Sequence, residues 1–410
     1  MSASDSVIAG GQIAGPQVAG PQVAGTQVAG TTVAGPEEAL TLAVAQALRG
    51  PRGANPLVGA IITASDGRVL ASGYHRGRGT AHAEVEALAG FSGFGSFSGF
   101  NESSSTSRLG PADATLWITL EPCDHTGTTG PCTEAILASG IRTVRYAVAD
   151  PTGPDGGGAA RLRSAGLDVE QVDADQVRRA GAADLNRRWM LARDSGRPFV
   201  TAHLAQSLDG RVAAADGTSQ WITGPESRRH AHRVRSRVNA IIVGTGTVLA
   251  DDPRLTARDE DGRDLPRQPV PVVQGRRAVP AGAALRGGAS WVHVESHDPQ
   301  VVLDQLTAGD VAEGNTERHS VSTSWPHGGT SPGHVLIEGG PTVLSAWMGA
   351  GLVDEVFLYQ APLVLGSGPA GLDLPQHTTL SHALRLTLDA AENGALSRLG
   401  DDVLLHYAAP

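Results

Sequence analysis

The chain has 410 residues, with 32 basic and 42 acidic side chains and a formal net charge of −10. This length predicts two or three domains, each able to bury its own core without disulfides. The acidic balance argues against a partner such as nucleic acid, whose backbone requires a basic stripe. No apolar stretch is long enough for a membrane span, and the N-terminus lacks the features of a secretory signal. A soluble cytoplasmic protein is therefore expected.

Two residue counts narrow the possible chemistry. The sequence contains no lysine, so all 32 basic residues are arginines. This excludes a Schiff-base lysine, a lysine general base and the lysine of a P-loop. The only two cysteines are Cys123 and Cys132. Two cysteines cannot build a disulfide framework, so they form a lone bridge, are two core thiols, or belong to a site.

The N-terminal region is a five-residue repeat. Residues 12–36 read QIAGPQVAGPQVAGTQVAGTTVAGP, with glycine in every unit and no aromatic residue. Such a segment buries too little apolar area to offset its ordering entropy. We therefore predict a disordered tail over residues 1–36. A docking tail is the alternative, but the repeat carries no known recognition mode.

The next segments predict a helix and a hairpin. Pro36 and two acidic residues suit a helix N-terminus, and the apolar spacing continues to Gly50-Pro51. Strands over 57–63 and 68–72 are joined by an Asp-Gly turn. The Gly/Ser/Phe-rich stretch 90–108 predicts a flexible surface insertion.

From Ala114 onward, strands and helices alternate. Strands are predicted over 114–120, 141–148 and 167–172, with helices over 131–139 and 159–165. This order is typical of an α/β layer with a largely parallel sheet. The first domain is assigned to residues 37–180.

A polar, arginine-rich stretch over 176–197 precedes a second α/β region. Its first strand is predicted over 199–205, and its domain is assigned to residues 197–410. Residues 307–334 are expected to interrupt this domain as a loop.

One constellation in the first domain predicts a zinc site. His82, Cys123 and Cys132 offer three soft ligands, which suits Zn²⁺ with an open fourth position for water. Glu84, two residues after His82, is expected not to ligate but to move protons as the catalytic acid and base. His82 and Glu84 open one helix and Cys132 opens another, where the helix dipole favours a thiolate.

Each part of this pattern is weak alone. A His-x-Glu pair is usually a solvated helix turn, and two cysteines are usually core residues. Together they match the zinc-deaminase signature, except that the cysteines are nine positions apart rather than three.

The motifs ANPLVGAII, GYHRGRGTAHAEVEAL and TLEPCDHTGTTGPCTEAI resemble the deaminase half of the bifunctional riboflavin-biosynthesis deaminase/reductase family. That family has the same longer cysteine spacing. The resemblance implies a cytidine-deaminase-like three-layer domain. The implied substrate is 2,5-diamino-6-(5-phosphoribosylamino)pyrimidin-4-one, contacted by Asn55 and His75. It also implies zinc held by His82, Cys123 and Cys132, with Glu84 as the acid/base.

The second domain offers two glycine turns after strands, Val243–Thr247 and Ile337–Thr342. In the second turn Pro341 begins a helix whose free N–H groups suit an anion. Each turn alone is more often a plain tight turn.

The wider sequence resembles the reductase half of the same family, in segments that begin TAHLAQSLDG, VRSRVNAIIVGTGTV and VLIEGGPTVLS. The resemblance implies a dihydrofolate-reductase-like α/β domain that uses NADPH to reduce the ribosyl side chain to ribityl. The implied NADPH contacts are Ala205, Trp221, Thr247, Asp251 and the segment 340–346, including Gly340, Pro341 and Thr342. The implied substrate contacts are Ser219, Arg235, Leu255, Arg258 and Glu338.

The bland alternatives stand beside these roles. Guanidinium forks suit a sugar phosphate, but either Arg235 or Arg258 alone reads as a surface charge. Trp221 alone reads as core packing. The resemblance further implies a homo-oligomer joined through the reductase halves.

The sequence departs from the family at several positions. Thr128 stands where a basic residue is usual, and His203 stands where the first reductase strand usually has a lysine. Tolerated variation in a lysine-free chain and altered specificity are both open explanations. The alternative function is a divergent paralogue with one silent half or a different pyrimidine substrate. A nucleic-acid-editing deaminase is disfavoured, because no basic, aromatic-lined channel is evident.

Overall fold

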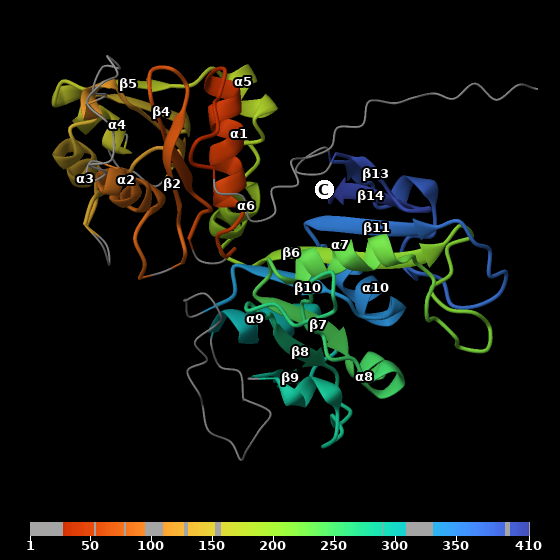
Figure 1. Ribbon diagram of the computed structural model, residues 1–410. Helices are drawn as coiled ribbons and strands as arrows, with labels where there is room; N and C mark the ends of the chain where they lie inside the picture. The colour runs from red at the N-terminus through yellow and green to blue at the C-terminus, as the bar shows by residue number, and fades with distance from the viewer. Residues whose placement is uncertain are drawn as a thin grey trace, which may run out of the picture.

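The computed structural model describes residues 28–52, 55–77, 79–94, 110–126, 130–151, 157–288, 290–308, 331–389 and 394–409. Two separate sheets with their helices form two domains (Figure 1). Within the described ranges, no helix combines the length and apolarity needed to span a membrane. Thr128 lies outside the described residues, as do most of the repeat, residues 95–109 and residues 309–330.

The N-terminal domain is built on a five-stranded sheet of order β2-β1-β3-β4-β5. The predicted hairpin forms its antiparallel edge, and β3, β4 and β5 run parallel. The strands are β1 (Gly59–Thr63), β2 (Val69–Tyr74), β3 (Thr115–Leu120), β4 (Thr143–Val148) and β5 (Asp168–Gln171).

Helices cover both faces of this sheet. One face carries α2, α3 and α4 and the other carries α1 and α5 (Figure 1). Alternate strand residues serve the two cores: Ile62 and Ile118 face the first group of helices, and Ile61 faces α1. The predicted three-layer α/β fold is confirmed. The helices are α1 (Pro36–Ala47), α2 (Ala83–Phe94), α3 (Cys132–Ser139), α4 (Gly157–Ser164) and α5 (Ala174–Arg179).

The end of the repeat differs from the prediction of a tail up to residue 36. Val28 and Val33 are buried against the α1 side of the sheet. Gly30 donates to the Val69 carbonyl and Val33 to the Gly67 carbonyl. The two valines find apolar partners and the backbone finds a strand edge, so this segment is ordered by tertiary contacts that composition alone does not reveal.

The C-terminal domain has a larger sheet of order β12-β14-β11-β6-β10-β7-β8-β9, with β13 also paired to β14. Its central strands are parallel, and β14 runs antiparallel to β11. The strands are β6 (Phe199–Ser207), β7 (Ala240–Gly244), β8 (Val270–Gln274), β9 (Val292–Val294), β10 (His334–Ile337), β11 (Glu355–Ala361), β12 (Thr387–Leu388), β13 (Leu396–Leu399) and β14 (Asp402–Ala408).

This sheet is also covered on both faces, which explains its continuous apolar strands. One core includes residues of α9 and α10, and the other includes residues of α7 and α8. Trp347 is fully buried in the first core, and its indole N–H donates to Gln274 at 2.8 Å. The helices are α7 (Pro225–Arg235), α8 (Thr245–Asp251), α9 (Pro299–Ala308) and α10 (Pro341–Gly349).

The stretch between the domains contains helices that the sequence reasoning missed. Residues 176–197 were interpreted only as a polar, arginine-rich connection. The structure forms the end of α5 and a further helix, α6 (Arg187–Ser195), which contacts β6 and β10. Its buried face uses the arginine Arg188 rather than an apolar stripe, so hydrophobic periodicity could not reveal it.

Candidate active sites

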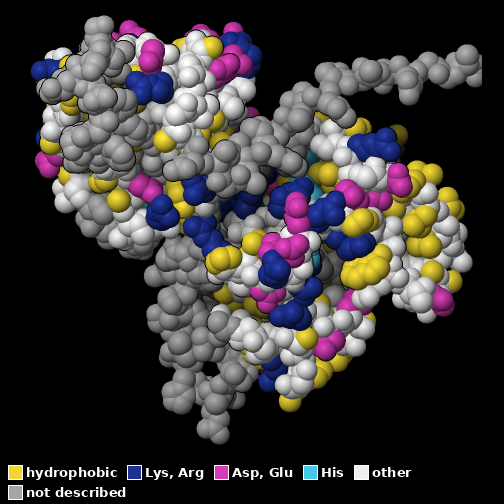
Figure 2. Space-filling model, viewed as in Figure 1, with side chains coloured by type: hydrophobic (Ala, Val, Ile, Leu, Met, Phe, Trp, Pro, Cys, Tyr) yellow, Lys and Arg dark blue, Asp and Glu magenta, His cyan; other side chains and the backbone are white. Residues whose placement is uncertain are grey.

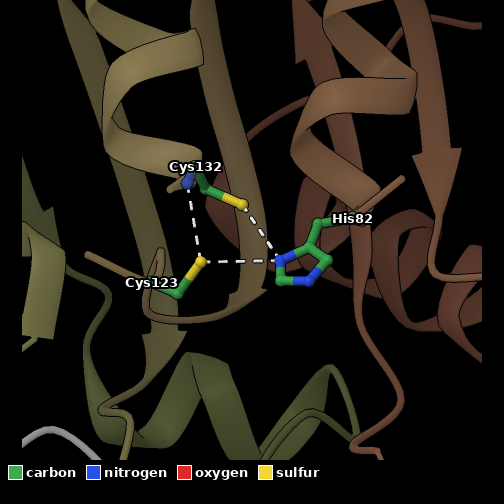
Figure 3. Close-up of side chains that lie close together, drawn as sticks. All are labelled: His82, Cys123 and Cys132. Atoms are coloured by element: carbon green, nitrogen blue, oxygen red, sulfur yellow. Dashed lines mark hydrogen bonds between the residues drawn. The ribbon is translucent and has the colours of Figure 1, made fainter. Parts of the chain in front are cut away.

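The three predicted zinc ligands converge in the N-terminal domain. His82 directly precedes α2, Cys132 is the first residue of α3, and Cys123 lies in the loop after β3 (Figure 3). His82 Nδ1 lies 3.2 Å from Cys132 Sγ and 3.5 Å from Cys123 Sγ. The three donor atoms all lie within 4.8 Å of one another. Three separate segments thus aim one donor each at a common point.

The loop that carries Cys123 is fixed by backbone hydrogen bonds. The Cys123 carbonyl accepts from Thr133 N at 3.3 Å, and the Pro122 carbonyl accepts from Gly158 N at 2.9 Å. Glu121, which precedes Pro122, is buried, and its carboxylate accepts hydrogen bonds from the backbone N–H groups of Asp150 and Ala159. The position of this thiol is therefore determined by α3 and α4 together.

The chemistry of the donor set fits zinc. The Cys132 thiol donates to Cys123 and, together with His82, lowers the pKa of Cys123 to about 4. The hydrogen bond to Cys123 raises the pKa of His82. One imidazole and two thiols that already share protons at short range provide the three-ligand set of a catalytic zinc site, which keeps a fourth position open.

Glu84 lies beside this cluster but outside the set of three donors. Only 3% of its surface is exposed, and burial raises the pKa of its carboxyl to about 7. A carboxyl with that pKa both accepts and releases a proton near neutral pH, which is the property required of a general acid/base.

Asn55 and His75 lie next to the ligands. Asn55 Nδ2 is 2.8 Å from His75 Nε2, and the His75 ring packs edge-on against the His82 ring with 5.3 Å between centroids. Burial lowers the pKa of His75, which favours the neutral imidazole. The structure therefore brings together all six residues predicted for the deaminase site.

In the C-terminal domain, Arg235, Glu338 and His203 form a second cluster. Arg235 Nε donates to both Glu338 oxygens at 3.0 Å, and His203 Nδ1 lies 3.2 Å from Glu338 Oε1. Burial by itself would raise the pKa of Glu338, but Arg235 and His203 outweigh burial and hold the pKa below its usual range. Glu338 is thus a fixed negative charge.

Sequence reasoning missed two residues beside this cluster, Tyr359 and His230. Tyr359 Oη lies 2.8 Å from His230 Nδ1 and 3.4 Å from His203 Nε2. Burial raises the pKa of Tyr359 well above its ordinary value. The pairing of β11 with β6 sets Tyr359 opposite Ala205, two residues from His203, and His230 comes from helix α7. Local sequence shows neither of these contacts.

The loop after α8 extends the cluster. The Thr256 carbonyl accepts from Arg235 Nη1 at 3.2 Å, and Arg258 Nε donates to Thr256 Oγ1 at 3.0 Å. Leu255 adopts a φ of 56°, an unusual conformation for a residue with a side chain. Four of the five predicted substrate residues, Arg235, Leu255, Arg258 and Glu338, thus share one region, whereas Ser219 lies on a separate loop after β6.

The residues predicted to bind NADPH are only partly assembled. A Cβ added at Gly340 would lie 3.9 Å from Thr247 Oγ1, so the two glycine turns meet. Gly340 caps α10, and Pro341 and Thr342 line a cavity with Ser345, Ala346 and the segment 369–376. Ala205 and Asp251 are exposed on β6 and α8.

Trp221 differs from its core interpretation, because 69% of its surface is exposed and its ring stacks under the Arg228 guanidinium.

The fold and the two clusters define a two-domain enzyme with a zinc deaminase unit and a separate reductase unit. Comparison with known families agrees. The model "Cytidine and deoxycytidylate deaminase zinc-binding region" matches residues 35–148, and the model "RibD C-terminal domain" matches residues 198–395.

Individual relatives make the assignment specific. The riboflavin biosynthesis protein RibD of Mycobacterium tuberculosis (strain H37Rv) is 38% identical over 377 residues, covering 91% of this chain and 97% of the relative. RibD of Escherichia coli K12 is 34% identical, covering 90% and 97%. The chain belongs to the RibD family of bifunctional riboflavin-biosynthesis deaminase/reductases.

Solved structures agree over most of the chain. RibD of Acinetobacter baumannii (form 1) superposes with a TM-score of 0.69 at 29% identity, covering 91% of this chain and 98% of that chain. A deaminase/reductase from Thermotoga maritima gives 0.70 at 27% identity with the same coverage. The predicted activities, a zinc-dependent deaminase and an NADPH-dependent reductase in riboflavin biosynthesis, are confirmed, and a divergent paralogue is not favoured.

Proposed function

We propose that the deaminase unit converts 2,5-diamino-6-(5-phosphoribosylamino)pyrimidin-4-one to the corresponding uracil and that the reductase unit converts its ribosyl side chain to ribityl. The observation that carries this proposal is the convergence of His82, Cys123 and Cys132 on one point beside buried Glu84 and the Asn55–His75 pair. A pyrimidine substrate is common to the family.

In the deaminase unit, each residue has one proposed role. His82, Cys123 and Cys132 hold zinc, which when bound supplies an activated water for attack on the ring carbon that bears the amino group. Glu84 would accept the two protons of the attacking water in turn, passing the first to the ring nitrogen and the second to the amino group, which leaves as ammonia. Asn55 and His75 contact and orient the pyrimidine.

In the reductase unit, charged side chains are proposed to make most of the substrate contacts. Arg258 is proposed to bind the sugar phosphate with its guanidinium fork. The Arg235 guanidinium is already bonded to Glu338 and to the Thr256 carbonyl, so Arg235 is proposed to contact the substrate beside that carboxylate. Arg235 already holds Glu338 in its ionised form, so the Glu338 carboxylate is fixed as an acceptor for a substrate hydroxyl or N–H. Leu255 and Ser219 complete the proposed substrate contacts.

NADPH is proposed to lie along the glycine turns and the start of α10. Gly340, Pro341 and Thr342 offer the N-terminus of that helix to the cofactor phosphates, and Thr247 lies beside them. Ala205, Asp251 and exposed Trp221 are the remaining proposed contacts. NADPH supplies the hydride for the open-ring sugar carbon, and the protein positions the two reactants.

Selective loss of each activity tests this assignment. The His82→Ala variant is expected to lose zinc and ammonia release while it oxidises NADPH normally on the uracil substrate. The Arg258→Ala variant is expected to show the reverse pattern, with a KM for the uracil substrate raised roughly tenfold or more by loss of a charged contact. A variant that reduces both activities equally would contradict the division of roles.

The homo-oligomer and the cytoplasmic location stay predictions. Light scattering of the purified protein measures the first, and fractionation of the cells that make it measures the second. A molar mass close to 42.1 kDa would contradict the predicted oligomer.

A further inference from the structure

The described part of the segment between α1 and β1, residues 51–52 and 55–57, lies where the two domains meet. This segment, the Asn55 loop, carries Asn55, whose amide lies against His75 in the deaminase site. Arginine side chains, dark blue in Figure 2, gather between the two domains. Across this junction Arg267 of the C-terminal domain donates to the Arg49 carbonyl at 3.1 Å. The backbone groups of such a loop need partners, so whatever binds them fixes where Asn55 points.

Asn186 holds the C-terminal end of the Asn55 loop. Its Oδ1 accepts from Leu57 N at 2.7 Å, and its Nδ2 donates to the Leu57 carbonyl at 2.9 Å. Both hydrogen bonds are buried, and the Asn186 amide satisfies the Leu57 N–H and C=O groups as a neighbouring strand would. Asn186 is the residue immediately before α6, on the connection to the reductase domain.

Asn239 holds the other end. This residue, immediately before β7, is 2% exposed, and its Nδ2 donates to the Arg52 carbonyl at 3.1 Å. Its Oδ1 accepts from Gly333 N and His334 N, both at 3.0 Å. One amide therefore joins the Asn55 loop to two parallel strands of the reductase sheet.

The two asparagines are themselves fixed. Arg188, two residues after Asn186, forms a buried ion pair with Glu355 on β11, and Thr201 Oγ1 donates to the same carboxylate at 2.9 Å. Breaking a buried ion pair is costly, so α6 stays on the reductase sheet. A narrow cavity beneath the loop is lined from both domains by Arg52, Asn55, Leu57, Leu185, Asn186, Arg188, Trp189, Gly333 and His334.

We propose that Asn186 and Asn239 are positioning residues of the deaminase, through which the reductase domain holds the Asn55 loop in its substrate-binding conformation. This inference rests on the proposed role of Asn55. It assigns the reductase domain a part in the first reaction, exerted through hydrogen bonds to the Asn55 loop. The zinc ligands and Glu84 lie on other segments, so the asparagines act on substrate binding and not on the metal.

Full-length Asn186→Leu and Asn239→Asp variants test the inference. Aspartate keeps the acceptor for Gly333 and His334 but has no N–H for the Arg52 carbonyl. Each variant is expected to raise the KM for ammonia release about tenfold, the scale of a lost buried hydrogen bond, with kcat within about twofold. Zinc content and NADPH oxidation on the uracil substrate are expected to match those of the wild type.

Two further variants decide between explanations. Gln268 clamps Ala257 in the same manner inside the reductase domain, so Gln268→Leu is the matched control and is expected to leave the deaminase KM unchanged. The Asn55→Ala/Asn186→Leu double variant is expected to show the KM of Asn55→Ala alone.

An unchanged KM in Asn186→Leu while Asn55→Ala raises it would overturn the inference and leave the role of Asn55 intact. An unchanged KM in Asn55→Ala would overturn both. Additive effects in the double variant, or equal loss of both activities, would also overturn the inference, because they indicate general destabilisation.

Discussion

His203 is the residue at which this chain departs most clearly within its described active sites. The resemblance to the family implies a lysine at this position in the first reductase strand, and this chain has histidine. The ring spans two partners, with Nδ1 near Glu338 and Nε2 near Tyr359. A carboxylate held by Arg235 as well does not depend on His203 for its charge. The histidine therefore positions Glu338 and Tyr359 relative to each other.

Replacement of His203 tests this role. His203→Ala is expected to lower the reductase kcat/KM roughly tenfold to a hundredfold, because two buried hydrogen bonds are lost beside the substrate. His203→Lys is expected to recover most of that loss, since the ammonium group reaches Glu338. Steady-state NADPH oxidation on the uracil substrate measures both. Equal activity of the alanine variant and the wild type would show that the side chain has no role.

Glu84 gives a second prediction at this scale. Glu84→Gln is expected to keep zinc at the wild-type content and to lower the deaminase kcat by roughly 10²–10⁴, the usual contribution of a general acid/base. Glu86→Gln is the matched control, since Glu86 lies one half-turn further along α2 and pairs with Arg76 at the surface. Ammonia release and metal analysis are the measurements. Loss of zinc from Glu84→Gln would mean that Glu84 supports the metal instead of moving protons.

At the scale of elements, α4 determines the position of a zinc ligand that it does not contain. Its first residue, Gly157, adopts a φ of +66°, and a Cβ there would lie 2.3 Å from the Glu121 carboxylate. The Glu121 carboxylate accepts a hydrogen bond from Ala159 N, near the start of α4. Glu121 itself lies only two residues before Cys123 in the sequence. The close approach of helix and carboxylate requires glycine.

The two ends of α4 provide a matched pair of variants. Gly157→Ala is expected to lower the free energy of unfolding by about 3 kcal/mol and to reduce zinc content, because Glu121 must move from its backbone donors. Gly166→Ala, with a φ of +87° but no atom within 4 Å, is expected to cost only about 1 kcal/mol and no zinc. Urea unfolding and metal analysis compare them. Equal effects would refute the role of Glu121.

The zinc site was predictable because each ligand is marked locally. Histidine before one helix and Pro-Cys at the start of another are short motifs, and both helices begin where they were predicted. Helix α2 then continues to Phe94, into the stretch predicted as a surface insertion. The reductase cluster was predictable only by resemblance, because His230 on helix α7 and Tyr359 on strand β11 come together through tertiary packing. Helix α6 was missed because its buried face is polar, and the residues 28–35 were taken for a tail because their partners lie elsewhere in the chain.

At the scale of the whole molecule, a buried ionic network ties the linker helix to the reductase sheet. Glu355 accepts from Arg188 and lies 2.9 Å from His406 Nε2, and Arg187 pairs with Asp389 nearby. Burial alone would raise the pKa of Glu355, but Arg188 and His406 outweigh it and hold the pKa below its ordinary value of 4.5. Arg188 and Arg187 thus supply the positive charges that balance the carboxylates of Glu355 and Asp389.

The network predicts a specific acid sensitivity. A depressed carboxyl pKa stabilises the fold above the ordinary value and loses that contribution as the pH falls toward the folded-state pKa. Glu355→Gln is therefore expected to be less stable than the wild type by about 3 kcal/mol at pH 7 and by clearly less at about pH 3.5. Urea unfolding at both pH values measures the difference. A difference that stays constant would contradict the assigned network.

The most direct test of the two-unit account is a coupled assay on the full-length, zinc-loaded protein. The substrate is the undeaminated phosphoribosylaminopyrimidine, and ammonia and NADPH are counted in the same sample. The account predicts one ammonia released for each NADPH oxidised at completion, with ammonia appearing first. It also predicts that ammonia release continues when NADPH is withheld. Oxidation of NADPH without ammonia, or the absence of both products, would contradict the assignment of these two reactions to this chain.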